Sequence, residues 1–324
     1  MGGAINAALE IRGAGAQVLR STEPLGEYPQ RITDRLEQWA REVPDRSFVA
    51  KRTRLTDGSG GDWRRISYAD MLARAQVVGQ ALVNRGLSPE RPVVILSDND
   101  LEHLTLVMGA LWVGVPHATL SSAYSVVAQD YTKLKHIIDT LKPGLIFASH
   151  GAPYARAINA CVGSDVEVVL TEGEIDGRRS THFDSLLDTP LSTSSVAAHA
   201  RVSADTIAKF MFTSGSTKHP KGVVITQRMW CANQQMLRQC MAFLSEEPPV
   251  LVDWLPWNHT FGGNHNVGIT VYNGGTLYID DGKPTPKGMA ETLRNLREIQ
   301  PTVYFNVPKG FDEIATAMNT DAAL

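Results

Sequence analysis

The chain has 324 residues, of which 43% are hydrophobic and 20% are charged, and its formal net charge is −3. This length supplies core for roughly two domains, and the composition is that of an ordinary soluble globular protein. The small negative charge provides no basic surface, so neither nucleic acid nor anionic lipid is expected as a partner.

The cysteines and the apolar runs indicate the compartment. Cys161, Cys231 and Cys240 form no C-x-x-C pair and are too few for a disulfide framework, which favours a reducing cytosol. The most apolar run, residues 104–115, is too short to span a membrane, and the first residues lack the pattern of a signal peptide. We expect a cytoplasmic protein without a transmembrane segment; the sequence gives no oligomeric state.

Residues 1–27 are rich in glycine and are expected to form a poorly structured leader. From residue 28 to residue 183, helical and extended patterns alternate, which is typical of a doubly wound, mostly parallel α/β sheet. The expected helices are 32–41, 67–85 with Ser67 as N-cap and Gly86 as terminator, 101–112, 130–141 and 154–161; the expected strands are 47–52, 93–96, 145–148 and 166–170.

Residues 184–205 are rich in Ser, Thr and Asp and are expected to form a surface connection between two α/β subdomains, residues 28–183 and 206–324. Within the second subdomain the patterns predict strands at 207–212, 250–254 and 302–305, and helices at 226–244, 286–299 and 308–318.

Directly after the strand 207–212 comes Thr-Ser-Gly-Ser-Thr-Lys-His-Pro-Lys-Gly, residues 213–222, with four hydroxyl side chains and two glycines. Small residues leave backbone N–H groups free to converge on an anion, and hydroxyls add further donors. The pattern therefore predicts a loop that binds the phosphates of a nucleotide. The alternative is a polar surface turn after a strand.

The loop is not the P-loop of ordinary NTPases, which needs G-x-x-x-x-G-K-[ST]. Counted from Gly215, Pro220 stands in place of the second glycine. Gly222 follows Lys221 where a magnesium-binding hydroxyl is required. A motor or signalling NTPase is therefore disfavoured.

The same loop resembles the phosphate loop of the adenylate-forming enzymes, which include acyl- and aryl-CoA synthetases, luciferases and the adenylation domains of peptide synthetases. Their pattern is T-S-G-[ST]-T-G-x-P-K-G, and this chain departs from it only at Lys218, which replaces a glycine. Either the loop sits differently there, or the extra cation adds phosphate affinity. Five further segments extend the resemblance and are similar to feruloyl-CoA synthase and its close relatives: residues 95–103, 121–125, 226–236, 252–264 and 272–284.

The resemblance implies the large N-terminal domain of the adenylate-forming fold, with ATP, Mg²⁺ and coenzyme A as ligands. It implies that Lys221 neutralises the phosphates and that Thr217 lies near Mg²⁺. The residues that would wrap the β- and γ-phosphates are Thr213, Ser214, Gly215, Ser216, Thr217 and Gly222.

The resemblance also places His259 between the acid pocket and the nucleotide, as a catalytic residue beside Lys221. Trp257, Phe261 and Gly262 would line the acid pocket. Without the resemblance, the preferred interpretation of His259 is a histidine hydrogen-bonded at a turn. Trp254 and Trp257 are either core residues or pocket walls.

Other polar residues are expected to be structural. Asp280 and Asp281 resemble a pair of metal ligands, but a solvated turn before Gly282 is the preferred interpretation. His103, His117 and His136 are expected to have no catalytic role.

Relatives in this family continue past the region matched here, with a Tyr-Gly-x-Thr-Glu segment and a small C-terminal domain. No tyrosine of this chain is followed by glycine. We therefore expect a fragment that ends before the C-terminal domain and that cannot complete adenylation alone at a normal rate.

The leading hypothesis is an ATP-dependent acid–CoA ligase acting on a small-molecule carboxylic acid, a hydroxycinnamate such as ferulate. The alternatives are a fatty acid–CoA ligase and a non-catalytic module that binds a nucleotide or an acyl adenylate.

Overall fold

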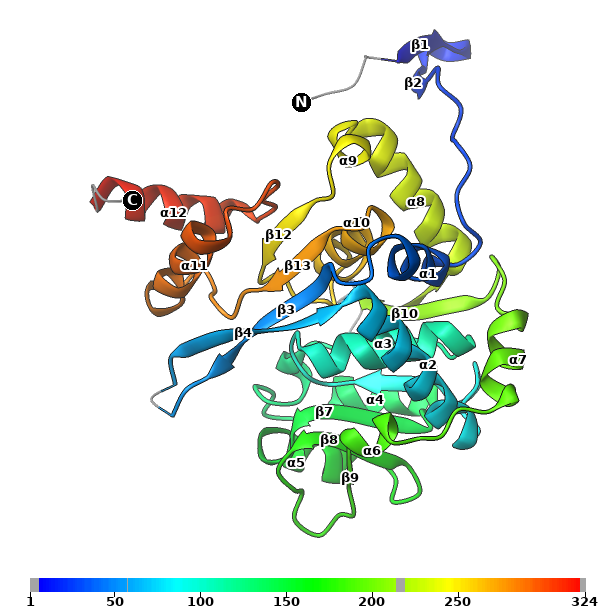
Figure 1. Cartoon of the computed structure of the whole chain (residues 1–324), viewed down its shortest axis with the longest axis vertical. Helices are drawn as coiled ribbons and strands as arrows, with labels where there is room; N and C mark the ends of the chain where they lie inside the picture. The colour runs from blue at the N-terminus through cyan, green and yellow to red at the C-terminus, as the bar shows by residue number, and fades with distance from the viewer. Residues whose placement is uncertain (1–5, 57, 214–218, 321–324) are drawn as a thin grey trace.

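The computed structural model describes residues 6–56, 58–213 and 219–320, which form two larger sheets packed against helices and a separate two-stranded sheet (Figure 1). The strands are β1 (Ala7–Ile11), β2 (Gln17–Ser21), β3 (Ser47–Arg54), β4 (Gly60–Ser67), β5 (Val93–Ile95), β6 (His117–Thr119), β7 (Leu145–His150), β8 (Glu167–Glu172), β9 (Thr181–His182), β10 (Ile207–Thr213), β11 (Lys221–Thr226), β12 (Val250–Asp253) and β13 (Thr276–Ile279). The helices are α1 (Ile32–Glu42), α2 (Tyr68–Asn84), α3 (Leu101–Val113), α4 (Thr132–Leu141), α5 (Gly151–Cys161), α6 (Asp184–Leu187), α7 (Thr193–Arg201), α8 (Gln227–Cys240), α9 (Phe243–Glu246), α10 (Val267–Tyr272), α11 (Pro286–Ile299) and α12 (Pro308–Thr320), with short turns η1 (Gly13–Gly15) and η2 (Ser122–Tyr124) and a π-helical segment η3 (Thr260–Asn266).

The larger sheet has seven strands in the order β11-β10-β6-β5-β7-β8-β9. All neighbours are parallel except β10 and β11, which form an antiparallel pair. Strands β5, β6 and β7 are almost wholly buried, as expected for parallel strands that are covered by helices on both faces. The prediction of a mostly parallel α/β fold is confirmed.

The second sheet has four strands in the order β12-β13-β3-β4. Strands β3 and β4 precede residues 184–205, whereas β12 and β13 follow them, and β13 pairs with β3 in parallel. Strand β10 likewise joins β6 across this segment. Because both sheets take strands from either side, residues 184–205 do not separate the two sheets.

Helices α2 and α3 fill the space between the two sheets (Figure 1). Every residue of α3 is buried, so this helix belongs to the core on all sides. The two helices approach closely because Gly79 and Gly109 meet at their crossing; a Cβ added to Gly109 would lie 2.6 Å from a Val78 methyl carbon. Helices α4 and α5 cover the opposite face of the larger sheet with a second apolar cluster.

The ends of α2 follow from its sequence as predicted. The Ser67 side chain accepts a hydrogen bond from the Asp70 backbone N–H at 3.1 Å, which satisfies one free donor of the first turn. Gly86 follows the helix with φ of 64°, a conformation that favours glycine.

Four expected elements differ in the structure. The segment 302–305 is not a strand. The Val250 carbonyl accepts the Thr302 N–H at 3.1 Å, but the Val250 N–H donates to the Thr302 hydroxyl instead of to a backbone carbonyl. The helix expected at 226–244 is divided at Met241, whose backbone leaves the helical region.

The other two differences are additional elements. Residues 184–205 contain the helices α6 and α7, and Ser192 caps α7 rather than forming part of a loop. The predicted leader contains the β1–β2 hairpin, which stands apart from the body of the molecule (Figure 1).

Candidate active site

The candidate site lies where the carboxyl ends of strands from the two larger sheets converge. Residues 97–99 follow β5, and residues 254–257 follow β12. The Asn99 amide joins these two loops: its Nδ2 donates to the Leu255 carbonyl at 2.9 Å, and its Oδ1 accepts from the Trp257 N–H at 3.0 Å. Ligands of open α/β sheets bind at this edge, because loops from several strands meet there.

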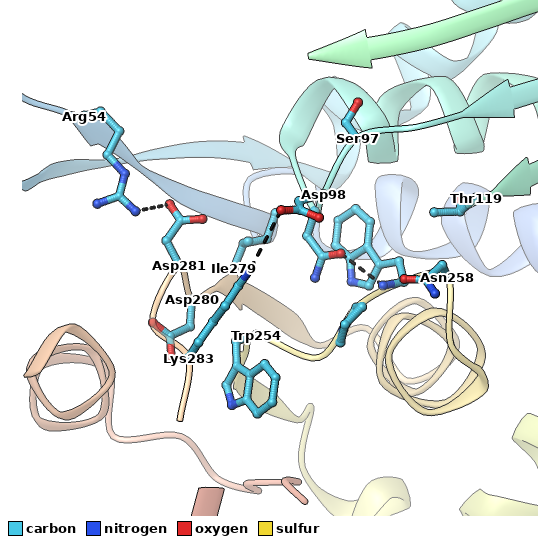
Figure 2. Close-up of a pocket in the computed structure, with 13 residues that line it drawn as sticks. Arg54, Ser97, Asp98, Thr119, Trp254, Asn258, Ile279, Asp280, Asp281 and Lys283 are labelled. Atoms are coloured by element: carbon cyan, nitrogen blue, oxygen red, sulfur yellow. Dashed lines mark hydrogen bonds and ion pairs between the residues drawn. The ribbon is translucent and has the colours of Figure 1, made fainter. Parts of the chain in front are cut away.

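A cavity of about 160 Å³ opens at this junction (Figure 2). Polar and aromatic side chains from both sheets surround it. Its lining consists of Arg54, Ser97, Asp98, Asn99, Thr119, Trp254, Pro256, Trp257, Asn258, Ile279, Asp280, Asp281 and Lys283.

Charged residues form the rim of this cavity. Asp281 lies between two cations, with its carboxylate 2.8 Å from the Arg54 guanidinium and 3.5 Å from Lys51 Nζ. Lys283 points toward Asp98, 3.8 Å away, across the gap between the two sheets (Figure 2). These ion pairs are partly exposed, so they orient the loops more than they stabilise the fold.

Asp280 is buried, and this overturns the prediction that Asp280 and Asp281 form a solvated turn. Its carboxylate accepts hydrogen bonds from the Gly282 N–H, the Thr292 hydroxyl and the Asn295 amide. Burial raises the pKa of Asp280, while these three donors lower it. Asp280 therefore fastens the middle of α11 to the end of β13.

Below the cavity, His103 is fully buried and neutral. Burial lowers the pKa of His103 to about 4. Its Nδ1 lies 3.1 Å from the Asp98 carbonyl and its Nε2 3.1 Å from the Thr119 hydroxyl, so Nδ1–H is assigned as the donor to the carbonyl. The ring also meets Trp257 edge to face at 4.9 Å. His103 supports the cavity, in agreement with the structural role expected for it.

Only the ends of the predicted phosphate loop can be described. Thr213 ends β10 and pairs with Lys221, the first residue of β11, and both side chains are exposed. Gly222 is also exposed and lies beside the Phe212 ring. The remaining predicted loop residues, Ser214, Gly215, Ser216 and Thr217, lie outside the described residues, as does Lys218.

The predicted acid-pocket residues lie on one continuous segment. Trp257 is buried and lines the cavity, whereas His259 is exposed and directly precedes η3. Phe261 is 37% exposed, and Gly262 is buried against the Leu255 and Pro256 carbonyls. The structure thus brings Trp257 to the cavity and places the other three in the turn that follows it.

The sequence alone assigns no role to Asn99 or Arg54. Asn99 lies in the Ser-Asp-Asn-Asp run after β5, and its partner carbonyl is 156 residues away. A polar run after a buried strand marks a loop at the sheet edge, and this was the one available signal. The loop that Asn99 contacts is determined by how the two larger sheets pack against each other.

Among the described residues, no group of three or more His, Cys, Asp or Glu side chains could hold a metal ion. Across the same residues, no helix combines the length and the apolarity needed to cross a membrane.

The sequence of this chain is similar to a family model and to known proteins. The family model described as "AMP-binding enzyme" matches residues 36–323. Fatty acyl-CoA synthetase B of Dictyostelium discoideum is 24% identical over 305 residues, covering 88% of this chain and 42% of the relative. The 4-hydroxyphenylalkanoate adenylyltransferase of Mycobacterium marinum is 26% identical over 240 residues, covering 71% of this chain and 35% of the relative. The chain spans about two fifths of the length of the curated relatives it matches first.

A solved structure shares the fold. It is a fatty acyl-adenylate ligase from Legionella pneumophila in complex with acyl adenylate and pyrophosphate. The TM-score is 0.63 at 16% identity, covering 85% of this chain and 44% of that protein.

Proposed function

This chain belongs to the AMP-binding enzyme family, and on that basis we propose that it carries the ATP- and acid-binding part of an acid–CoA ligase. In this proposal a carboxylic acid is first activated as an acyl adenylate. The acyl group is then transferred to coenzyme A.

One observation carries the proposal above the others. Thr213 and Lys221 face each other at the two ends of a loop rich in glycine and hydroxyls, at the carboxyl end of β10. Both side chains are exposed, so a hydroxyl and a cation are free to meet an anionic ligand. Because β10, β6 and β5 are parallel, this end of β10 lies at the same edge of the sheet as Thr119 and residues 97–99.

The first half-reaction needs little covalent chemistry from the protein. A carboxylate oxygen attacks the α-phosphorus of ATP, the bond to the bridging oxygen breaks, and pyrophosphate leaves with that electron pair. Positioning two anions and neutralising charge on the phosphate oxygens are the main requirements. Lys221 would neutralise the β- and γ-phosphates, residues 213–217 with Gly222 would surround them, and Mg²⁺ would lie near Thr217.

In the second half-reaction, the coenzyme A thiol loses its proton and its sulfur attacks the acyl carbon. The bond from that carbon to the phosphate oxygen breaks, and AMP leaves with the electron pair. In the first half-reaction, His259 would orient the incoming carboxylate between the pocket and the nucleotide, since it is exposed at the start of η3 beside the buried Trp257. Phe261 and Gly262 would complete the wall of the acid pocket.

For the acid, we propose a hydroxycinnamate such as ferulate. The motif resemblance supports this choice, and so does the name of one relative, which is an adenylyltransferase for 4-hydroxyphenylalkanoates. The second candidate is a fatty acid, because several similar proteins are fatty acyl-CoA synthetases.

The test is a panel of acids offered to the complete gene product with ATP and coenzyme A. Ferulate, 4-hydroxycinnamate, decanoate and palmitate are supplied separately, and CoA thioesters are measured by mass spectrometry. A feruloyl or coumaroyl thioester is the expected product. Thioesters of the fatty acids alone would replace the proposed substrate, and binding of ATP without any thioester would favour a non-catalytic binding module.

A further inference from the structure

A buried lysine under η3 has a role that the proposed reaction leaves open. Lys209 lies on β10 and is 5% exposed. Its Nζ donates to the Gly263 carbonyl at 3.2 Å and lies 3.5 Å from the centre of the Trp230 ring. No carboxylate in the described part of the chain forms an ion pair with it. A lysine ammonium has three N–H donors, and this one has a single carbonyl acceptor.

A second buried polar side chain lies beside this lysine. His117 on β6 is 4% exposed and is the direct partner of Lys209 in the parallel ladder. Directly paired residues project from the same face of a sheet, so the two side chains enter the same space. Within residues 6–56, 58–213 and 219–320, neither ring nitrogen of His117 has a hydrogen-bond partner.

If Lys209 and His117 had only a structural role, their burial would cost folding free energy. A buried polar group without a partner loses its hydration and gains nothing in return. Two apolar side chains at positions 117 and 209 would fill the same space without this cost. A bound polar ligand that forms hydrogen bonds with the free donors and acceptors would remove this cost.

The position of Lys209 and His117 indicates the class of this ligand. Gly263, the acceptor for Lys209, lies in η3 four residues after His259. A Cβ on Gly263 would lie 2.1 Å from the Trp257 carbonyl, so this turn packs directly on the backbone of the predicted acid pocket. Trp230, which covers the lysine, is itself fixed by a 2.9 Å bond from its Nε1 to the Asn264 carbonyl. Lys209 therefore lies between the sheet and the turn that follows Trp257, and His117 is its neighbour on the same face of the sheet.

We propose that Lys209, together with His117, forms the polar end of the acid pocket and binds the oxygen that an aromatic acid carries at the end remote from its carboxylate. This inference rests on the proposed function and deepens it: the substrate class is an aryl acid with a phenolic hydroxyl. A fatty acid has no oxygen at that end and would leave His117 without a partner and Lys209 with the Gly263 carbonyl as its one acceptor.

The chemistry of the amine suits a phenol. Burial lowers the pKa of Lys209 to about 7, so amine and ammonium are both populated near neutral pH. The amine accepts a hydrogen bond from a phenol, and the ammonium donates one to the phenol oxygen. His117 is neutral, since burial and the nearby Lys209 charge hold its pKa well below the ordinary value, and it offers one donor and one acceptor.

The experiment compares 4-hydroxycinnamate with cinnamate as substrates of the complete gene product, with pyrophosphate release giving kcat/KM. Sites built to bind a substrate hydroxyl discriminate strongly against the analogue that lacks it, so the wild type should prefer 4-hydroxycinnamate by about tenfold or more. Lys209→Met should lose about 10–100-fold with 4-hydroxycinnamate and change about threefold or less with cinnamate, so that the preference disappears. Lys135→Met, a change of an exposed lysine on α4, is the matched control and should retain the preference.

Equal preference in the wild type and Lys209→Met would overturn the inference while leaving the proposed function intact. Absence of pyrophosphate release with every acid, in the wild type as well, would overturn the proposed function instead. If Lys209→Met does not fold, His117→Leu provides the same test, because it removes the other polar group from the same space. An unchanged preference in that variant would also count against the inference.

Discussion

The Asn99 side chain accepts a hydrogen bond of 3.0 Å from the backbone N–H of Trp257, and this contact connects the two larger sheets at the candidate site. The other half of the same amide donates to the Leu255 carbonyl at 2.9 Å. Asn99 thus uses both ends of its amide to fix one loop. The position of the Trp257 side chain at the cavity depends on these two hydrogen bonds.

Asn99→Ala should lower the free energy of unfolding by about 1–3 kcal/mol, because two backbone groups lose their partner. Chemical denaturation followed by circular dichroism measures this change. Asn319→Ala, on the exposed face of α12, is the control and should change it little. Equal stabilities for both variants would show that Asn99 does not fasten the loop.

Lys221→Ala should weaken ATP binding by about 10–100-fold, since a charged hydrogen bond to phosphate is lost. Because Lys221 is exposed, the melting temperature should stay the same. Calorimetric titration of ATP, with Lys135→Ala as the control, measures the difference. Unchanged affinity would remove Lys221 from the phosphate site.

Asp253 should make the protein less stable as the pH rises from about 4 to about 7. Burial, with the nearby Asp280 charge, raises the pKa of Asp253 from 3.8 to about 7. Below pH 4 the folded and unfolded states both hold the proton, so no penalty exists. Between pH 4 and 7 the unfolded state loses its proton first and gains stability relative to the folded state, and above pH 7 the penalty is constant.

Asp253→Asn removes this titration and keeps the oxygen that accepts the Leu255 N–H at 3.0 Å. The variant should match the wild type near pH 4 and exceed its stability by up to about 4 kcal/mol at pH 8. Urea unfolding at the two pH values tests this, with the exposed Asp139→Asn as the control. A gain that is equal at both pH values, or larger in acid, contradicts the assignment.

Gly263→Ala should destabilise the turn that carries the acceptor of Lys209. The added Cβ would lie 2.1 Å from the Trp257 carbonyl, and overpacking of this kind costs about 1–3 kcal/mol. Gly13→Ala is the control, since a Cβ there meets no atom within 4 Å. Thermal unfolding of both variants compares the effects, and equal melting temperatures would show that η3 yields to the extra carbon.

The sequence was most informative where local chemistry decides the structure. Ser67 and Gly86 mark the ends of α2 because a cap and a left-handed residue act within one turn of chain. The buried runs of β5 and β7 likewise predict parallel strands that are covered on both faces.

Features set by packing over long separations could not be predicted in the same way. Asp280 was expected in solvent because Asp-Asp-Gly is a turn sequence, yet Thr292 and Asn295 of α11 cover it. The sequence predicts that Lys209 lies in an apolar strand. No neighbouring residue indicates that its side chain is buried or that it pairs with His117. The roles of His259, Phe261 and residues 214–217 stay predictions.

The central claim is that the loop after β10 holds a triphosphate so that an organic acid displaces pyrophosphate. Exchange of radiolabelled pyrophosphate into ATP by the complete gene product measures this step without coenzyme A. The account predicts exchange that requires ferulate or 4-hydroxycinnamate and falls at least tenfold in Lys221→Ala. Exchange without any acid, or equal exchange in the wild type and Lys221→Ala, would contradict it.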